Sequence, residues 1–120
     1  MDRSELVSVQ VERLDRPPVA IVRVRGELDF GTTPRLVEAL AGLPEPGQSV
    51  VFDLSELEFC DSSGLGALIA THKAAAAAGG RVHLAGVTPI VLTAIHVTSL
   101  DQLFPMHDTL EGALAEVRRA

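Results

Sequence analysis

The sequence of 120 residues lacks the features that mark secreted and membrane proteins. Cys60 is the only cysteine, so no disulfide can form within the chain, and this favours a reducing compartment. The opening stretch MDRSELVSVQ has no apolar core of the kind that a signal peptide needs, and no apolar run approaches the roughly 18 residues of a membrane span. We therefore expect a cytoplasmic protein that does not enter a membrane.

Positive charge is also scarce. The chain has 16 acidic residues against 10 Lys and Arg residues, which gives a net charge of -6. The only basic cluster is the short pair Arg118 and Arg119 near the C-terminus. Because a negative chain is repelled by phosphate backbones, we expect no direct nucleic-acid partner.

The motifs of several enzyme classes are missing or broken. No Gly-rich turn ends in Gly-Lys-Ser or Gly-Lys-Thr, so a P-loop is excluded. Residues 64–69, GLGALI, have Ile69 where a dinucleotide-binding fingerprint needs its last glycine. Neither Ser62 nor Ser63 has a glycine two positions away on both sides, as a nucleophile elbow requires. We therefore expect no catalytic residues, no cofactor and no enzymatic activity.

A metal site is not indicated either. The histidines His72, His83, His96 and His107 are spaced 11, 13 and 11 residues apart, without the i,i+4 pairing that places two ligands on one helical face. Cys60 has no cationic neighbour in the sequence that would lower its pKa. We expect it to be a small buried hydrophobic residue rather than a redox thiol.

What the sequence does contain is the pattern of one α/β domain. Its 47% hydrophobic and 22% charged residues are typical of globular proteins, and its length suits a single domain over residues 1–120. Periodicity and turn residues predict, in chain order, strands around 7–11 and 19–28, a helix over 32–43, a central strand over 49–54, a helix over 65–78, a strand over 81–86, a helix from Thr88-Pro89, a connector over 99–108 with one short edge strand, and a last helix from Asp108.

This order of elements predicts how they pack. Strands that alternate with crossover helices imply a mixed sheet of four to five strands with about four α-helices packed on it. We expect a threonine to cap the first helix and its residues Leu36 and Val37 to point inward. Asp108 and Glu111 resemble a capping box at the start of the last helix.

The segment FCDSSGLGAL, residues 59–68, places Asp61, Ser62, Ser63 and Gly64 between a strand pattern and a helix pattern. Asp and Ser are preferred N-caps, so helix capping explains part of this composition. One cap suffices for one helix, however, and a glycine at this turn lets a partner backbone approach closely. From the residues alone, capping and a partner-binding site both remain open.

Two motifs together carry a resemblance to a known family. GELD at residues 26–29 and DSSGLG at residues 61–66, with DLSELEF leading into the second, resemble the anti-sigma factor antagonists of the STAS-domain family. The likeness runs from the strand that ends in GELD to the HDTLEGAL stretch near the C-terminus. It implies a small mixed sheet with helices on one side.

The resemblance also implies a function. By position, Ser62 matches the residue that a partner serine kinase phosphorylates, with Ser63 as the alternative acceptor. Asp29, Asp61, Ser63 and Gly64 match the same partner-binding surface. In the family, the unphosphorylated protein binds an anti-sigma factor that is itself the kinase and so frees a sigma factor, and a metal-dependent serine phosphatase restores it.

We therefore expect a monomeric binding module that is switched by phosphorylation. The alternative is a stand-alone STAS sensor that binds a small ligand or nucleotide without a kinase partner, with its serines serving only as helix caps.

Overall fold

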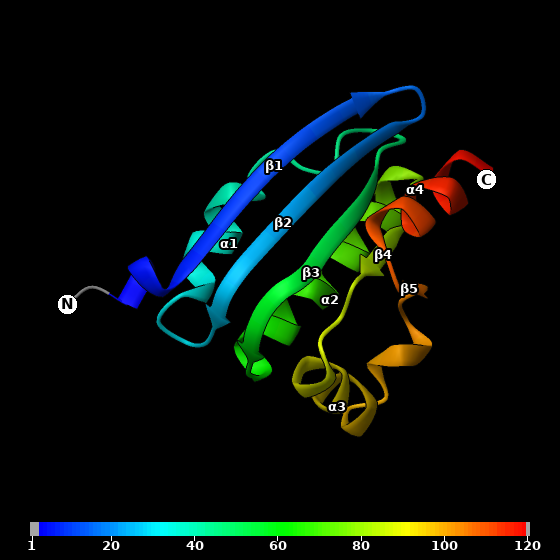
Figure 1. Cartoon of the computed structure of the whole chain (residues 1–120). Coiled ribbons are helices and arrows are strands. Elements are labelled where there is room, and N and C mark those ends of the chain that lie inside the picture. Colours follow the sequence, from blue (N-terminus) through cyan, green and yellow to red (C-terminus); the bar gives the residue numbers. More distant parts are fainter. Residues whose placement is uncertain (1–2, 120) are drawn as a thin grey trace.

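The structure is a computed structural model that describes residues 3–119. Its elements in chain order are η1 (Arg3–Leu6), β1 (Val7–Asp15), β2 (Pro18–Leu28), α1 (Thr33–Ala39), β3 (Ser49–Cys60), α2 (Ser62–Ala78), β4 (Val82–Ala85), α3 (Pro89–Val97), η2 (Leu100–Gln102), β5 (Met106–His107) and α4 (Leu110–Arg119). The five strands form one sheet in the order β1-β2-β3-β4-β5 (Figure 1). Only β1 and β2 are antiparallel, so the predicted mixed sheet with four α-helices is confirmed.

The central strand β3 is longer than the sequence predicted. The predicted strand ends at Leu54, but the observed strand continues through residues 55–60, where Leu57 and Cys60 are buried and the residues between them are exposed. Its pairing with β2 shifts register twice, once between Arg23 and Arg25 and once between Gly26 and Glu27. Each shift is a β-bulge, which inserts one extra residue and breaks the alternation of buried and exposed positions. The bulges explain why the two-residue period failed to predict this half of the strand.

The helices cover both faces of the sheet, contrary to the expectation of helices on one side. One core cluster joins buried residues of α1, α2 and α3 to strand residues such as Val22, Phe52 and Leu84. A second cluster joins α4 to Val19 and Val51, which alternate with the first set along the strands. Figure 1 accordingly shows α4 in front of the sheet and α2 behind it.

The first helix differs from its prediction in length, face and cap. It ends at Ala39 rather than near residue 43, and Leu36 is buried whereas Val37 is exposed. The hydroxyl of Thr32 makes no cap bond to α1. Instead it donates to the carbonyl of Glu27 and accepts from the amide of Asp29. Thr32 therefore fastens the turn before the helix.

The start of the last helix also differs from its prediction. Thr109, and not Asp108, accepts a hydrogen bond from the first turn of α4, from the amide of Gly112 at 3.0 Å. Asp and Thr are both good N-caps, so the sequence alone did not decide between neighbouring positions.

The prediction for α2 is confirmed. It runs from Ser62 to Ala78 and ends at Gly79, whose φ of 89° is the left-handed conformation typical of a C-terminal glycine. Between residues 3 and 119, no helix combines the length and the apolar character needed to cross a membrane.

Candidate functional site

The two sequence motifs meet at one end of the sheet. Leu28 and Cys60 are partners in the parallel pairing of β2 and β3, so GELD and DSSG leave the sheet at the same edge. The amide of Asp61 also donates to the carbonyl of Leu28 at 2.9 Å. In parallel sheets this carboxyl edge is the usual place for functional side chains.

Asp61 is the centre of the hydrogen-bond network at this edge. Its Oδ1 accepts bonds from the amides of Ser63 at 2.8 Å and Gly64 at 3.2 Å, which makes Asp61 the N-cap of α2. The same oxygen accepts from the Ser63 hydroxyl at 2.5 Å. Its Oδ2 accepts from the amide of Phe30 at 3.1 Å. The Ser63 hydroxyl and these three amides hold the pKa of Asp61 below its usual range.

Asp29 shapes the turn that follows β2. Its Oδ1 accepts from the amides of Gly31 at 2.9 Å and Thr32 at 3.0 Å. This is the pattern in which an Asp side chain closes a turn through its own backbone. Asp29 thus lies on the same end of the molecule as Asp61, and the Phe30 amide links the two loops.

The structure separates the two serines. Ser62, the first residue of α2, is exposed, and its hydroxyl has no hydrogen-bond partner within residues 3–119. Ser63 is partly buried, and its hydroxyl contacts both the Asp61 carboxylate and, at 3.3 Å, the Thr33 hydroxyl. Of these two serines, only Ser62 is therefore exposed with no hydrogen-bond partner for its hydroxyl among the described residues.

Gly64 does not lie where a partner backbone would reach it. It is buried, and a Cβ atom there would come within 2.7 Å of Cys60 Sγ and 2.9 Å of Leu28 Cβ. The expectation of an open contact point at Gly64 is therefore wrong: this glycine lets α2 pack closely on the sheet. Gly66 is the exposed glycine of the motif, with nothing within 4 Å of a Cβ.

Cys60, the last residue of β3, directly precedes Asp61 of this site. It is buried, and burial together with the neighbouring Asp61 charge raises the pKa of its thiol to about 12. The thiolate is the reactive form of cysteine, so this environment suits the predicted role of a small hydrophobic residue.

A histidine pair is the feature that the sequence did not predict. Nδ1 of His83 on β4 lies 3.0 Å from Nε2 of His107 on β5. His83 is buried, and its pKa is lowered by burial and by the charges of His107 and Arg81, while Glu116 opposes the shift. In residues 3–119, no three His, Cys, Asp or Glu side chains are grouped so as to hold a metal ion.

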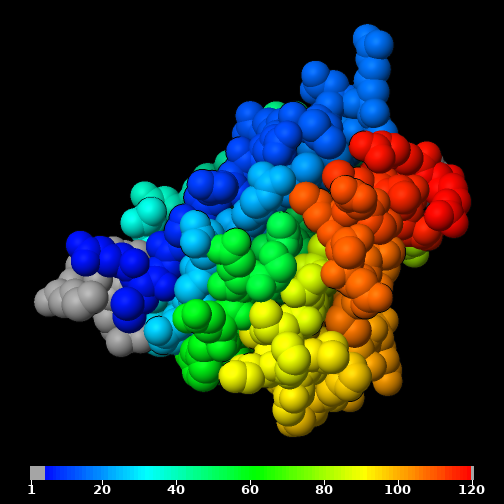
Figure 2. Space-filling view, in the orientation of Figure 1, coloured from blue at the N-terminus to red at the C-terminus, as the bar shows by residue number. Residues whose placement is uncertain are grey.

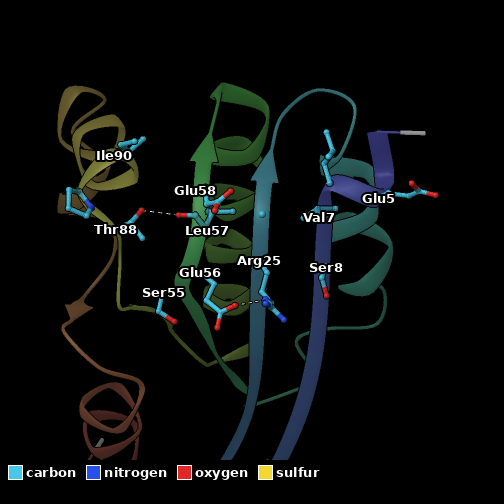
Figure 3. Close-up of a pocket in the computed structure, with 13 residues that line it drawn as sticks. Glu5, Val7, Ser8, Arg25, Ser55, Glu56, Leu57, Glu58, Thr88 and Ile90 are labelled. Carbon is cyan, nitrogen blue, oxygen red and sulfur yellow. Dashed lines mark hydrogen bonds and ion pairs between the residues drawn. The ribbon is translucent and has the colours of Figure 1, made fainter. Parts of the chain in front are cut away.

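A groove of about 790 Å³, which Ser62 does not line, lies between η1 and the start of α3 (Figure 3). Its floor includes Leu57 and Glu58 from the bulged part of β3. The Thr88 hydroxyl donates to the Leu57 carbonyl at 2.9 Å, and Arg25 forms an ion pair with Glu56. Figure 2 shows this face, where side chains of β1, β2 and β3 reach the surface beyond the part that α4 covers.

Comparison with known proteins supports the family that the two motifs indicated. The family model of the STAS domain matches residues 9–113. An anti-sigma F factor antagonist of Paenibacillus polymyxa is 31% identical over 113 residues, which cover 92% of this chain and 97% of that protein. The anti-sigma-F factor antagonist RsfB of Mycobacterium tuberculosis is 34% identical over 114 residues, which cover 92% and 91% of the two chains.

A solved structure agrees as well. The crystal structure of an anti-sigma factor antagonist from Mycobacterium paratuberculosis superposes with a TM-score of 0.81 at 36% identity, covering 93% of this chain and 94% of that chain. The chain belongs to the STAS domain family. The resemblance carried by GELD and DSSGLG is thereby confirmed.

Proposed function

We propose that this protein is an anti-sigma factor antagonist that is switched by phosphorylation of Ser62. Unphosphorylated, it binds an anti-sigma factor serine kinase and frees a sigma factor. Relatives that are anti-sigma factor antagonists over nearly their whole length support this function. The observation that carries the site is the exposed, unpartnered hydroxyl of Ser62 beside the bonded hydroxyl of Ser63.

The position of Ser62 explains how one modification changes binding without unfolding the protein. A phosphate adds about -1.5 to -2 charges at neutral pH. At the first position of α2 it meets the positive end of the helix dipole, worth about 0.3–1 kcal/mol per charge at an exposed site. The Asp61 carboxylate next to it repels it, so the gain to the fold is small.

Phosphorylation changes the free energy of partner binding much more than it changes the stability of the fold. A surface that packs against a neutral hydroxyl would have to bury a dianion without a counter-charge. That costs several kcal/mol, enough to abolish an interface of moderate affinity. The protein acts in this cycle as a monomeric binding module without catalysis, and a metal-dependent serine phosphatase returns it to the binding form.

Phosphorylation by the anti-sigma factor kinases of the same genome tests the proposal. Incubation with each kinase and ATP should add one phosphate to the intact mass, and site-resolved mass spectrometry should place it on Ser62. Ser62→Ala should remain unmodified and bind the kinase permanently, whereas Ser62→Asp should bind more weakly. Ser63→Ala is the matched control and should still accept phosphate; phosphate on Ser63 with Ser62 untouched would move the switch by one residue.

The groove in Figure 3 favours a second function, that of a sensor for a small ligand or nucleotide. Its volume of about 790 Å³ lies within the range of small-molecule sites. Titration with ATP and GTP, followed by calorimetry, distinguishes the two functions. A protein that binds a nucleotide but is modified by none of the kinases would support the sensor and contradict the switch.

A further inference from the structure

Three apolar side chains are exposed beside Ser63, and we call them the Phe30 patch: Phe30, Pro34 and Val37. The side chain of Phe30 is 86% exposed and that of Val37 56% exposed. Together with Thr33, Glu38 and Ser63 they line a hollow of about 450 Å³. Single exposed apolar residues are common on monomers, whereas several that line one hollow frequently mark an interaction site.

The backbone that carries Phe30 is fixed. The amide of Phe30 is bound by Asp61 Oδ2, and the amides on its C-terminal side, Gly31 and Thr32, are bound by Asp29 Oδ1. The hydroxyl of Thr32 closes the turn from within. Because the backbone of this turn is already held, binding has to order only the two side-chain torsions of Phe30, which favours its use as an anchor in an interface.

The patch is continuous with the proposed switch. Ser63 lines the hollow, and its hydroxyl lies 3.3 Å from that of Thr33, the first residue of α1. Ser62 directly precedes Ser63 in the chain. A kinase that covers the start of α2 at Ser62 would therefore come close to the Phe30 patch through Ser63.

We propose that the Phe30 patch is the apolar part of the docking surface for the anti-sigma factor kinase. The kinase presents a complementary apolar surface beside its active site. This inference rests on the proposed function and adds the part of the surface that supplies affinity. Ser62 supplies the switch, and Phe30 supplies the anchor. The phosphate then lies beside an apolar contact, and burying it there without a counter-charge is costly.

Affinity measurements on surface variants test the inference. Phe30→Ala should raise the Kd for the kinase at least about tenfold, because truncated aromatic anchors at interface centres dominate binding energy. Val37→Ser should change it in the same direction. Val97→Ala is the matched control, because Val97 on α3 is 79% exposed but lies outside the patch, and its Kd should stay within about twofold of the wild type. Circular dichroism and thermal unfolding should show all three variants folded.

The outcomes separate the inference from the function on which it rests. Wild-type protein that binds none of the kinases contradicts the proposed function. Wild-type protein that binds a kinase, while Phe30→Ala and Val37→Ser bind it equally well, contradicts only the docking surface. A wild-type dimer that Phe30→Ala dissociates in sedimentation would make a second copy the occupant and would also overturn the inference.

Discussion

The backbone amide of Phe30 donates a hydrogen bond to Oδ2 of Asp61 across 3.1 Å, while the other oxygen of that carboxylate caps α2. One side chain therefore joins the turn after β2 to the helix that begins with Ser62. The two motifs are 31 residues apart in sequence at these atoms, yet they form one surface because β2 and β3 run parallel and end together.

Replacing Asp61 should weaken the fold measurably. Asp61→Ala removes the cap of α2 and leaves the amide of Phe30 without its partner, so the free energy of unfolding should fall by about 0.5–2 kcal/mol or slightly more. Urea denaturation measures the change. Asp108→Ala is the control, because Asp108 precedes α4 without capping it and its loss should have little effect; equal losses in both variants would contradict the role of Asp61.

Asp61 should also make the protein sensitive to acid. Because its folded pKa lies below the unfolded value, the carboxylate contributes stability above the unfolded pKa of about 3.9 and loses it as pH falls through the folded pKa. Asp61→Asn should therefore lose less stability than the wild type when urea denaturation is repeated from pH 6 down to about pH 3. Parallel pH profiles for the two proteins would show that the carboxylate is not stabilised in the fold.

The two glycines of the DSSGLG motif should respond in opposite ways. Gly64→Ala should destabilise the protein by about 1–3 kcal/mol, because its Cβ must displace Cys60 or Leu28. Gly66→Ala has free space and should stabilise α2 by up to about 1 kcal/mol. Thermal unfolding compares them, and adding Cys60→Ala to Gly64→Ala should restore part of the loss. A fully stable Gly64→Ala would contradict the close packing of α2.

The thiol of Cys60 should be inert in the folded protein. With a pKa raised to about 12 by burial and by Asp61, it has almost no thiolate at pH 8. Alkylation by iodoacetamide, followed by mass spectrometry, should be at least about a hundredfold slower than in denaturing urea. Rapid labelling of the native protein would mean that the thiol is accessible.

The histidine pair should weaken the protein at mildly acidic pH. The pKa of His83 is lowered in the fold, so the unfolded chain binds more protons, and stability falls as pH drops from about 6.5 toward the folded pKa. His83→Gln should reduce this loss between pH 7.5 and pH 5, whereas exposed His96→Gln should keep the wild-type dependence. Urea denaturation at both pH values provides the comparison; identical losses in all three proteins would exclude His83 as the cause.

The sequence predicted the order of elements because most segments follow one simple period. The β-forming residues 19–28 and the helix-forming alanines of α2 with their terminal glycine pair predicted a strand and a helix, and the structure has both, although Val19–Val22 are buried in succession. The prediction from sequence failed where two neighbouring residues were equally good helix caps or where the strand period was broken. The bulges hid the second half of β3, and Thr109 rather than Asp108 caps α4.

The site could be predicted in position but not in detail. The motifs indicated Asp61 and the two serines, and the structure brings them to one edge with Asp29. The sequence could not show that the Ser63 hydroxyl is hydrogen-bonded to Asp61 and that the Ser62 hydroxyl has no such bond, since adjacent serines have the same local preferences. Phe30 was missed because one exposed aromatic residue in a loop has no period, and its significance depends on contacts across the fold.

The length of α2 has a further consequence for the charge of the phosphate. At about 1.5 Å per residue, the 17 residues of α2 place its last turn roughly 25 Å from Ser62. The Debye length at physiological salt is about 8 Å, so the field of a phosphate has decayed through about three such lengths at that end. There the carbonyl of Ala78 accepts a hydrogen bond from the amide of Gly47 at 2.6 Å. The turn around Gly47 is therefore electrically remote from the switch, and a fluorophore attached there would follow the fold of the protein without sensing whether Ser62 is charged.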